Sequence, residues 1–453
     1  MAIQPPEARD VRDTLRDAIS GHQAERLSEI LRGLPPREAA EALDALPPAD
    51  LAYAVTLLGD EQLADVLENL DASDAARLIL KLSRAQAADV LEEMDPDDAA
   101  DVVGELEPDD AHAILVEMET PEAEDLRELL AYPPESAAGL MTQDVVSVRP
   151  DLTAEEVLAA IRRVAQEAET IYYVYVTDEV GTLLGVLSLR DLVLAPSSTP
   201  IGELTRRDLV KVRADADQET AARLLAERGL LAIPVVDERD RLLGIITADD
   251  AADVLEEEAT EDVEKLGGSE PLHEPYLRSG VFDLVKKRVR WLLVLFVAEA
   301  YTGSVLRHYA DTLAAAVSLS FFIPLLIGTG GNTGSQITTT LTRALATGEV
   351  RFLDLPRVLW KEWGVAVLLG AVMATATLVR AWTLGVEPHV GAVVALTAAC
   401  IVLWAATVAA VLPLGLRRFG IDPAVVSTPL ITTLVDGTGL VIYFTIANWF
   451  LGL

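Results

Sequence analysis

The feature that most constrains this chain is a series of five apolar stretches that begins after residue 288. They lie at about 289–308, 313–330, 362–383, 390–414 and 427–451. Each is close to the ~20 residues that an α-helix needs to cross the hydrocarbon core of a membrane. Five spans would put the C-terminus on the opposite side of the membrane from the N-terminal part. A large soluble helical core is the alternative explanation of such long apolar runs.

The distribution of Lys and Arg favours the membrane interpretation. Under this topology the segments on the N-terminal side hold ten basic residues: Lys286, Lys287, Arg288, Arg290, Arg343, Arg351, Arg357, Lys361, Arg417 and Arg418. The opposite side has two, Arg307 and Arg380. Cytoplasmic loops typically carry such an excess, whereas a soluble core has no reason to show it. The first residues lack the basic and apolar regions of a secretory signal peptide, so we expect the N-terminal part to be cytoplasmic.

The first 280 residues are strongly acidic. They contain 63 of the 72 Asp and Glu residues and 24 of the 36 Lys and Arg residues, a balance of −39. This excludes a nucleic-acid-binding protein, because contacts to phosphates need clustered basic side chains. The sequence also lacks a nucleophile–base pair, a Walker motif and a Gly-rich dinucleotide loop. We therefore do not expect an enzyme.

Polar residues of the membrane half gather in two places, and the first is the segment from Pro324 to Thr340. The sequence predicts that glycines break the second span into open backbone here: Gly328, Gly330, Gly331 and Gly334. Open backbone at membrane depth must be satisfied by protein or by a water-filled cavity. Neutral oxygens suited to a hydrated ion come from Asn332, Thr333, Ser335 and Gln336. The alternative is a tight interhelical loop in which small residues allow close packing.

The second place is the fifth span, where Asp436 lies well inside an apolar segment. A carboxylate in hydrocarbon costs roughly 2.5–3.5 kcal/mol on insertion scales, so Asp436 should face water or a cation. The alternative is a structural Asp that hydrogen-bonds across helices. The other acids of the membrane half fall mostly near span ends. Hard oxygen donors without His or Cys favour Mg²⁺ over zinc or copper, and two chains on a symmetry axis could share one site.

The N-terminal region contains a twelve-residue repeat. One apolar series comprises Leu34, Leu46, Leu58, Leu70, Leu82, Met94, Leu106, Met118 and Leu130, and a second comprises Leu43, Val55, Leu67, Ile79, Leu91, Val103 and Leu115. Residues 1–132 should therefore form an all-α helical-repeat superhelix. Its polar faces are acidic, as at Asp97 and Asp101, which share one helix face. Such a face is ordinarily solvated, and divalent cations that bridge it to another acidic surface are the functional interpretation.

Residues 133–258 contain an internal duplication, with halves at 139–195 and 201–258. Each half predicts strand, helix, strand, turn, strand and helix. The halves resemble a tandem CBS pair, an α/β module that often binds adenine nucleotides. Its signature Gly-x-x-Ser/Thr-x-x-Asp occurs twice, at Gly185, Ser188 and Asp191 and at Gly244, Thr247 and Asp250. The alternative is a purely structural, dimerising role.

An acidic linker connects this pair to the membrane half. Eight acids crowd one predicted helix of about five turns: Asp249, Asp250, Asp253, Glu256, Glu257, Glu258, Glu261 and Asp262. They repel one another unless cations neutralise them. Residues 259–288 form the acidic linker and an amphipathic connecting (plug) helix that leads into the first span. Residues 289–453 should form an all-α transmembrane bundle of five helices.

This order of parts resembles the MgtE family of magnesium transporters over essentially the whole chain. The specific matches are GTGGNTGSQ at 328–336, RALATGEV at 343–350, GIDPAVVSTPL at 420–430, TTLVDGTGLVIYF at 432–444 and VLEEEATED at 254–262. The resemblance implies a homodimeric, Mg²⁺-selective channel in the lipid bilayer of the cell membrane. It also implies closure by cytoplasmic Mg²⁺ and, as in some members, ATP bound at the CBS pair.

The resemblance further implies site residues. The pore aspartate corresponds to Asp436, and Asn332 lies by the same pathway. The polar residues and glycines near them make Gly331, Gln336, Thr432 and Thr433 further pore-lining candidates. Acids that correspond to sensor ligands are Asp97, Asp101, Asp217, Glu219, Asp250, Asp253, Glu258, Glu261, Asp262 and Asp422. Nucleotide contacts correspond to Ser188, Arg190 and Asp191. Gly229 stands where some members carry an acidic ligand, so one sensor site should be weaker or absent.

A rival function is a nucleotide-sensing scaffold or receptor in which the spans only anchor the CBS pair. Asp436 and the polar second span argue against it, since an anchor needs neither. The residues are compatible with Mg²⁺, Mn²⁺ or Co²⁺ as the ion, and with a channel or a coupled carrier.

Overall fold

The computed structural model describes residues 8–34, 39, 42–43, 46–164, 170–272, 276, 279–418, 422 and 426–452. Most of the GIDP segment of the GIDPAVVSTPL match lies outside the described residues. The chain divides into two compact units, Met1–Glu256 and Glu257–Leu453. The boundary falls within one long helix, α15 (Ala248–Leu266).

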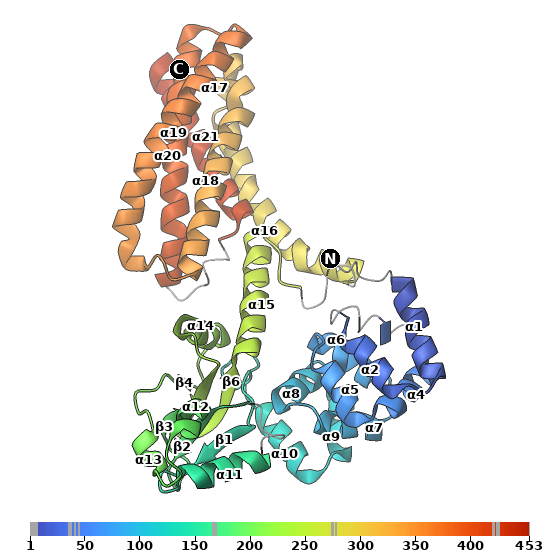
Figure 1. Cartoon of the computed structure of the whole chain (residues 1–453). Coiled ribbons are helices and arrows are strands. Elements are labelled where there is room, and N and C mark those ends of the chain that lie inside the picture. Colours follow the sequence, from blue (N-terminus) through green and yellow to red (C-terminus); the bar gives the residue numbers. More distant parts are fainter. Residues whose placement is uncertain are drawn as a thin grey trace, which may run out of the picture. The chain divides into compact units, whose positions relative to one another are not determined.

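The first part of unit 1 is an array of short helices (Figure 1). They are α1 (Ala8–Ser20), α2 (Ala24–Arg32), α4 (Pro48–Leu58), α5 (Asp60–Leu67), α6 (Ala72–Ile79), α7 (Arg84–Glu92), α8 (Pro96–Gly104), α9 (Pro108–Glu117) and α10 (Thr120–Leu129). Isolated helices this short are not stable in water. Alternate helices pack on each other: α5 on α7, α7 on α9, α6 on α8 and α8 on α10. Stacking therefore supplies the stability that each helix lacks.

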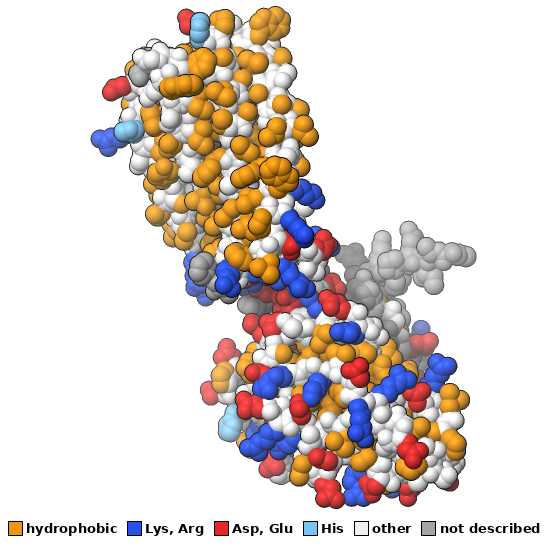
Figure 2. All heavy atoms as spheres, turned by 90° about the vertical axis from the view of Figure 1, so that its left-hand side faces the viewer, with side chains coloured by type: hydrophobic (Ala, Val, Ile, Leu, Met, Phe, Trp, Pro, Cys, Tyr) orange, Lys and Arg blue, Asp and Glu red, His pale blue; other side chains and the backbone are white. Residues whose placement is uncertain are grey.

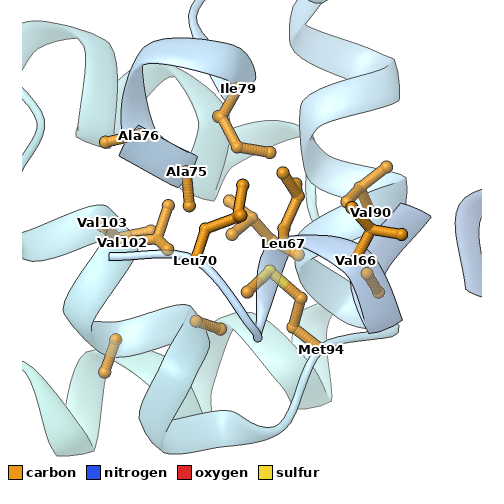
Figure 3. Close-up of a cluster of buried hydrophobic side chains, with 14 of the residues drawn as sticks. Val66, Leu67, Leu70, Ala75, Ala76, Ile79, Val90, Met94, Val102 and Val103 are labelled. Atoms are coloured by element: carbon orange, nitrogen blue, oxygen red, sulfur yellow. The ribbon is translucent and has the colours of Figure 1, made fainter. Parts of the chain in front are cut away.

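The local sequence explains where these helices begin. Pro96 and Pro108 occupy first-turn positions, where proline removes no intrahelical hydrogen bond. Ser83 forms a capping box with Gln86 at the start of α7. Both predicted apolar series face inward, with Leu34, Leu82 and Leu130 only partly buried. Figure 3 shows the middle of this core, where Leu67, Leu70 and Met94 lie together. The predicted helical-repeat fold is confirmed.

The duplicated segment forms two small sheets. The first contains β1 (Val145–Val148), β2 (Thr170–Thr177) and β3 (Leu183–Ser188), and the second contains β4 (Val212–Arg213), β5 (Ala232–Val236) and β6 (Leu242–Thr247). In each sheet the first two strands are parallel and the last two antiparallel. The helices of this segment are α11 (Ala154–Val164), α12 (Leu189–Leu194), α13 (Ile201–Leu204), α14 (Gln218–Arg228) and the start of α15. The predicted order of strands and helices is confirmed.

The repeat array and the second half of the duplicated segment share one hydrophobic core. Ile233, Ile246, Ala251 and Val254 belong to the same buried cluster as the repeat leucines. The start of α15 is thus packed against the acidic repeats within unit 1.

Unit 2 is a bundle of long helices (Figure 1). It contains α16 (Val281–His308), α17 (Ala310–Ala315), a 3₁₀ segment (Val317–Phe322), α18 (Ile323–Ala346), a second 3₁₀ turn (Phe352–Asp354), α19 (Leu355–Leu384), α20 (Pro388–Arg418) and α21 (Thr428–Leu451). Among the described residues, four segments are long and apolar enough to cross a membrane: Val281–His308, Phe352–Leu384, Pro388–Arg418 and Thr428–Leu451. Figure 2 shows hydrophobic side chains over the bundle, with Lys and Arg gathered at one end. The fifth span stays a prediction, for which α18 is the candidate.

The prediction that glycines open the second span is wrong. Ile323–Ala346 is a continuous α-helix of 24 residues that includes all four glycines. The irregular backbone lies earlier, at Val317–Phe322, inside the segment 313–330 that was expected to be the span. Each glycine costs a helix about 1 kcal/mol relative to alanine, and three of these four lie where neighbouring helices approach closely. The small residues allow close packing, as the alternative assumed, but they do so within a helix and not in a tight interhelical loop.

Candidate functional site

The glycine face of α18 packs directly on α21. A Cβ atom added at Gly330 would lie 2.7 Å from Val435, and one added at Gly334 would lie 2.6 Å from Ile431. At Gly331 it would lie 2.8 Å from Thr432, whose hydroxyl is 3.5 Å from that of Ser335. Glycine is needed here because a side chain would push the two helices apart. The predicted pore-lining residues Gly331 and Thr432 are thus in contact.

Asp436 lies in the middle of α21, a few residues beyond this contact. Its side chain is 8% exposed, and among the described residues Oδ1 has no hydrogen-bond partner. The adjacent Gly437 lies against α16, where an added Cβ would be 3.1 Å from the hydroxyl of Thr302. A buried carboxylate oxygen without a partner is costly, so the site suits a cation or its bound water. The structural alternative needs a hydrogen bond across helices, and Oδ1 of Asp436 forms none with the described residues.

The other predicted pore residues are polar groups on exposed or half-buried surface. Asn332 and Gln336 are exposed and four residues apart on α18, hence on one face. Thr432 and Thr433 are half-buried, and the Thr432 hydroxyl donates to the carbonyl of Thr428 at 3.0 Å. Side-chain amides at membrane depth need water or another chain as a partner. This face is therefore suited to a hydrated surface rather than to lipid.

In unit 1 the structure brings Asp97 of α8 and Asp250 of α15 together. Asp97 is 9% exposed, and its Oδ1 has no hydrogen-bond partner among the described residues. Burial raises the pKa of Asp97 well above its usual range, and the charge of Asp250 adds to this effect. Burial also raises the pKa of Asp250, although the Thr247 hydroxyl donates to its carboxylate. Two predicted sensor acids thus lie close enough to repel each other, and nearby positive charge is too small to offset this repulsion.

A second acidic group, beside the first, was not predicted from the sequence. Glu68, Asp95 and Asp98 can each place one carboxylate oxygen within 4.8 Å of the others, a spacing that could hold a metal ion. The Asp95 N–H donates to Glu68 at 2.9 Å, and 24 residues later the Glu119 N–H donates to Glu92 in the same way. The sequence contains a signal for this contact, because the twelve-residue repeat places equivalent acids 24 residues apart. That signal can be interpreted only when it is known that alternate helices of the repeat stack on each other.

We expect Asp98 to make the stability of unit 1 dependent on pH. Burial raises the pKa of Asp98 from 3.8 to about 8, with the charges of Glu68 and Asp250 adding to it. The stabilising contribution is complete below about pH 4 and is lost as the pH rises to about 8, since only the protonated form is well accommodated. Asp98→Asn should raise the melting temperature of residues 1–256 by about 3 °C near pH 8 and hardly at all near pH 4.

A matched control comes from the repeat itself. Asp110 occupies the position twelve residues after Asp98, and Asp110→Asn should leave the pH dependence unchanged. A divalent cation should raise the melting temperature of the wild type more than that of Asp98→Asn. Equal shifts for Asp98→Asn at both pH values would contradict this account.

In unit 2 the predicted ligands Glu261 and Asp422 meet at a lysine. Lys265 of α15 forms an ion pair with Asp422 at 3.0 Å and another with Glu261. Burial would lower the pKa of Lys265, but the hydrogen bonds to Glu261 and Asp422 outweigh it and raise the pKa. Glu258 and Asp262 lie half-buried on the same helix. Lys265, to which no sequence pattern pointed, supplies the positive charge here.

None of the remaining predicted sensor acids is buried as Asp97 is. Asp217 accepts from the Thr220 N–H at 3.1 Å and caps α14, while Glu219 pairs with Arg223. Asp101 is exposed one turn after Asp97. Asp253 is also largely exposed, and its partial desolvation, together with the charges of Glu256, Asp249 and Asp71, raises its pKa.

Gly229 has a structural role at the end of α14. Gly229 ends α14 in the left-handed conformation, with φ of +61°. Glycine adopts this conformation without the steric cost that an acidic residue would meet.

The CBS signature residues have structural roles in this fold. A Cβ at Gly185 would lie 2.5 Å from the carbonyl oxygen of Arg206, and one at Gly244 would lie 2.3 Å from that of Thr142. Ser188 accepts from the Asp191 N–H at 3.1 Å, and Asp191 pairs with Arg206 at 2.8 Å. Arg190 is exposed. These contacts fit the structural alternative, and nucleotide binding would require Asp191 to exchange its arginine partner.

Comparison with known proteins matches each part of the chain to a described family. A family described as divalent cation transporter (MgtE) matches residues 323–446, the MgtE intracellular N domain matches 11–135, and the CBS domain matches 137–198 and 201–257. The chain is 46% identical over 324 residues to the magnesium transporter MgtE of Thermus thermophilus, covering 72% of each protein. It is 35% identical over 335 residues to the magnesium transporter MgtE of Enterococcus faecalis, covering 73% of this chain and 72% of that protein. The crystal structure of the soluble part of a magnesium transporter superposes with a TM-score of 0.51 at 31% identity, covering 56% of this chain and all of that one.

Proposed function

Because the chain belongs to the MgtE family of magnesium transporters, we propose that it conducts Mg²⁺ through the cell membrane as a homodimeric channel. In this proposal the acidic domains are cytoplasmic, and Mg²⁺ bound to them closes the pore. The curated relatives that match over most of the chain are magnesium transporters, which is not an enzymatic function. The observation that carries the proposal is the buried, unpaired carboxylate of Asp436 between α16 and α18.

Asp436 is suited to hold hydrated Mg²⁺. Mg²⁺ loses its water reluctantly and is usually bound through one or two carboxylates with several waters retained. The hydroxyls of Thr432 and Thr433 and the amides of Asn332 and Gln336 can accept hydrogen bonds from or donate them to such waters. A two-fold axis beside α21 would add the carboxylate of a second chain. The proposed pore thus needs no dehydration of the ion at Asp436.

Closure by Mg²⁺ follows from the repulsion among the cytoplasmic acids. The buried Asp97 and the half-buried Asp250 repel each other, and Glu68, Asp95 and Asp98 lie beside them. A divalent cation removes this repulsion and favours the compact arrangement. The free-energy shift that the cation causes between the open and closed states equals the difference between its binding free energies for those two states. Several such sites, including Asp101, Asp217, Glu219, Asp253, Glu258 and Asp262, would make the response steep.

Lys265 has a defined part in this proposal. Its ammonium group already neutralises Glu261 and Asp422, so a cation that binds these acids must displace it. The same region joins α15, α16 and the start of α21, because the Trp291 indole donates to Ser427 at 3.0 Å and packs on Gly268. A change at the linker acids can therefore reach the helix that carries Asp436.

ATP at the CBS pair is a subsidiary proposal. Ser188, Arg190 and Asp191 lie at the start of α12, where backbone N–H groups favour an anionic group. Displacement of Arg206 from Asp191 would accompany binding of the ribose.

Growth of a bacterium that lacks its own Mg²⁺ uptake systems distinguishes transport from the scaffold alternative. We expect expression of this chain to restore growth at low Mg²⁺, because the pore supplies the missing uptake. A CBS scaffold anchored by its helices would not restore growth. Failure of a well-expressed, membrane-inserted chain to do so would favour the scaffold.

A further inference from the structure

A second carboxylate lies within the membrane bundle, on α16. Glu299 is in the middle of the apolar stretch 289–308, within α16 (Val281–His308), and its side chain is exposed on the protomer. Within the part of the chain that the structure describes, no Lys, Arg or His forms an ion pair with it. A carboxylate in contact with hydrocarbon is strongly unfavourable. Glu299 therefore requires water or a cation beside it.

The packing of α16 on α21 places Glu299 near Asp436. Glu299 precedes Thr302 by three residues, so both lie on one face of α16. Thr302 is 6% exposed and contacts Gly437, the residue that follows Asp436. The hydroxyl of Thr302 and Oδ1 of Asp436 both lack a hydrogen-bond partner among the described residues. The carboxyl groups of Glu299 and Asp436 also interact electrostatically.

The contact between α16 and α21 at Glu299, Thr302 and Asp436, called the seam below, combines negative charge with polar atoms that lack hydrogen-bond partners. Two carboxylates in a medium of low dielectric constant repel each other strongly, and a divalent cation between them turns the repulsion into attraction. The Thr302 hydroxyl can bond a water molecule of the ion's hydration shell. One protomer then supplies two negative charges to the surroundings of the ion.

We propose that Glu299 is a second acidic residue of the Mg²⁺ pathway and that it binds the hydrated ion together with Asp436 and Thr302. This rests on the proposed transport function and adds a residue of α16 to it. Asp436 remains the principal ligand, because it is the buried carboxylate. Glu299 lies on the exposed side and raises the local concentration of divalent cations at the seam.

The test is the dependence of Mg²⁺ flux on Mg²⁺ concentration, measured with the full chain in liposomes. Glu299→Gln removes the charge and keeps the shape, and we expect the half-saturating Mg²⁺ concentration to rise about tenfold. Cobalt(III) hexammine, which mimics hydrated Mg²⁺, should block the wild type at lower concentrations than the variant. Glu299→Asp should restore most of the apparent affinity.

Val297→Gln is the matched control, because it puts the same amide on the exposed surface of α16 two residues away. It should leave the half-saturating concentration unchanged. Glu299→Ala is the second variant if the glutamine disturbs assembly, and the same rise is expected.

Unchanged half-saturation in Glu299→Gln and Glu299→Ala would overturn the assignment of Glu299. A rise of equal size in Val297→Gln would also overturn it, since any polar change on α16 would then suffice. Loss of flux in Asp436→Asn alongside an unaffected Glu299→Gln would leave the transport proposal standing. Absence of flux in the wild type would instead contradict the transport proposal itself.

Discussion

We expect the replacement of Asp436 with alanine to abolish Mg²⁺ flux and to leave the protein folded. Asp436 is a buried carboxylate with an unpaired oxygen, so its removal takes away the negative charge that stabilises the ion at mid-membrane. Loss of such a charge in a low-dielectric site should reduce flux by about 100-fold or more. The measurement is Mg²⁺ uptake into liposomes that contain the purified protein, with size-exclusion chromatography and thermal unfolding to check folding.

Asp436→Asn is the stricter version of this experiment, because the amide keeps the shape of the side chain. Glu387, exposed between α19 and α20, provides the control: Glu387→Gln removes one acid from unit 2 and should retain flux. Uptake at the wild-type rate in Asp436→Asn would remove this residue from the pore.

Deleting residues 1–130 should give a transporter that remains active and is poorly inhibited by cytoplasmic Mg²⁺. The deletion removes Asp97 and the group formed by Glu68, Asp95 and Asp98. Without these acids the closed state gains less from Mg²⁺, so the inhibiting concentration should rise about tenfold. The measurement is uptake at a series of Mg²⁺ concentrations on the cytoplasmic face.

The deletion also exposes apolar surface of the second CBS half, since the repeats share its core. A double variant, Asp97→Asn with Asp250→Asn, avoids this problem because it changes charge alone. It should reproduce the direction of the effect. Full inhibition in both proteins would count against the repeat array as a sensor.

The repeat array and the CBS pair were predictable because their signals are periodic or duplicated. Each position of the twelve-residue series predicts a side chain that points into the core. The side chains are buried as predicted, apart from those of Leu34, Leu82 and Leu130, which are partly exposed. The two signature glycines, Gly185 and Gly244, occur at equivalent positions of the two halves. Local sequence was sufficient for these parts.

The glycines of α18 show the limit of local sequence. Glycine weakens an isolated helix, which led to the prediction of open backbone, but Ile431 and Val435 of a distant helix fill the space beside them. Glu68, Lys265 and Glu299 were overlooked for the same reason. Their importance depends on partners such as Asp95, Asp422 and Asp436, which only the folded chain brings close.

One measurement tests the central claim most directly: Mg²⁺ uptake into liposomes under a Mg²⁺ gradient, with and without Mg²⁺ on the face that carries the acidic domains. We predict rapid uptake when that face is free of Mg²⁺ and a steep fall when Mg²⁺ is added there. Uptake that does not respond to Mg²⁺ on that face, or no uptake above protein-free liposomes, would contradict the account.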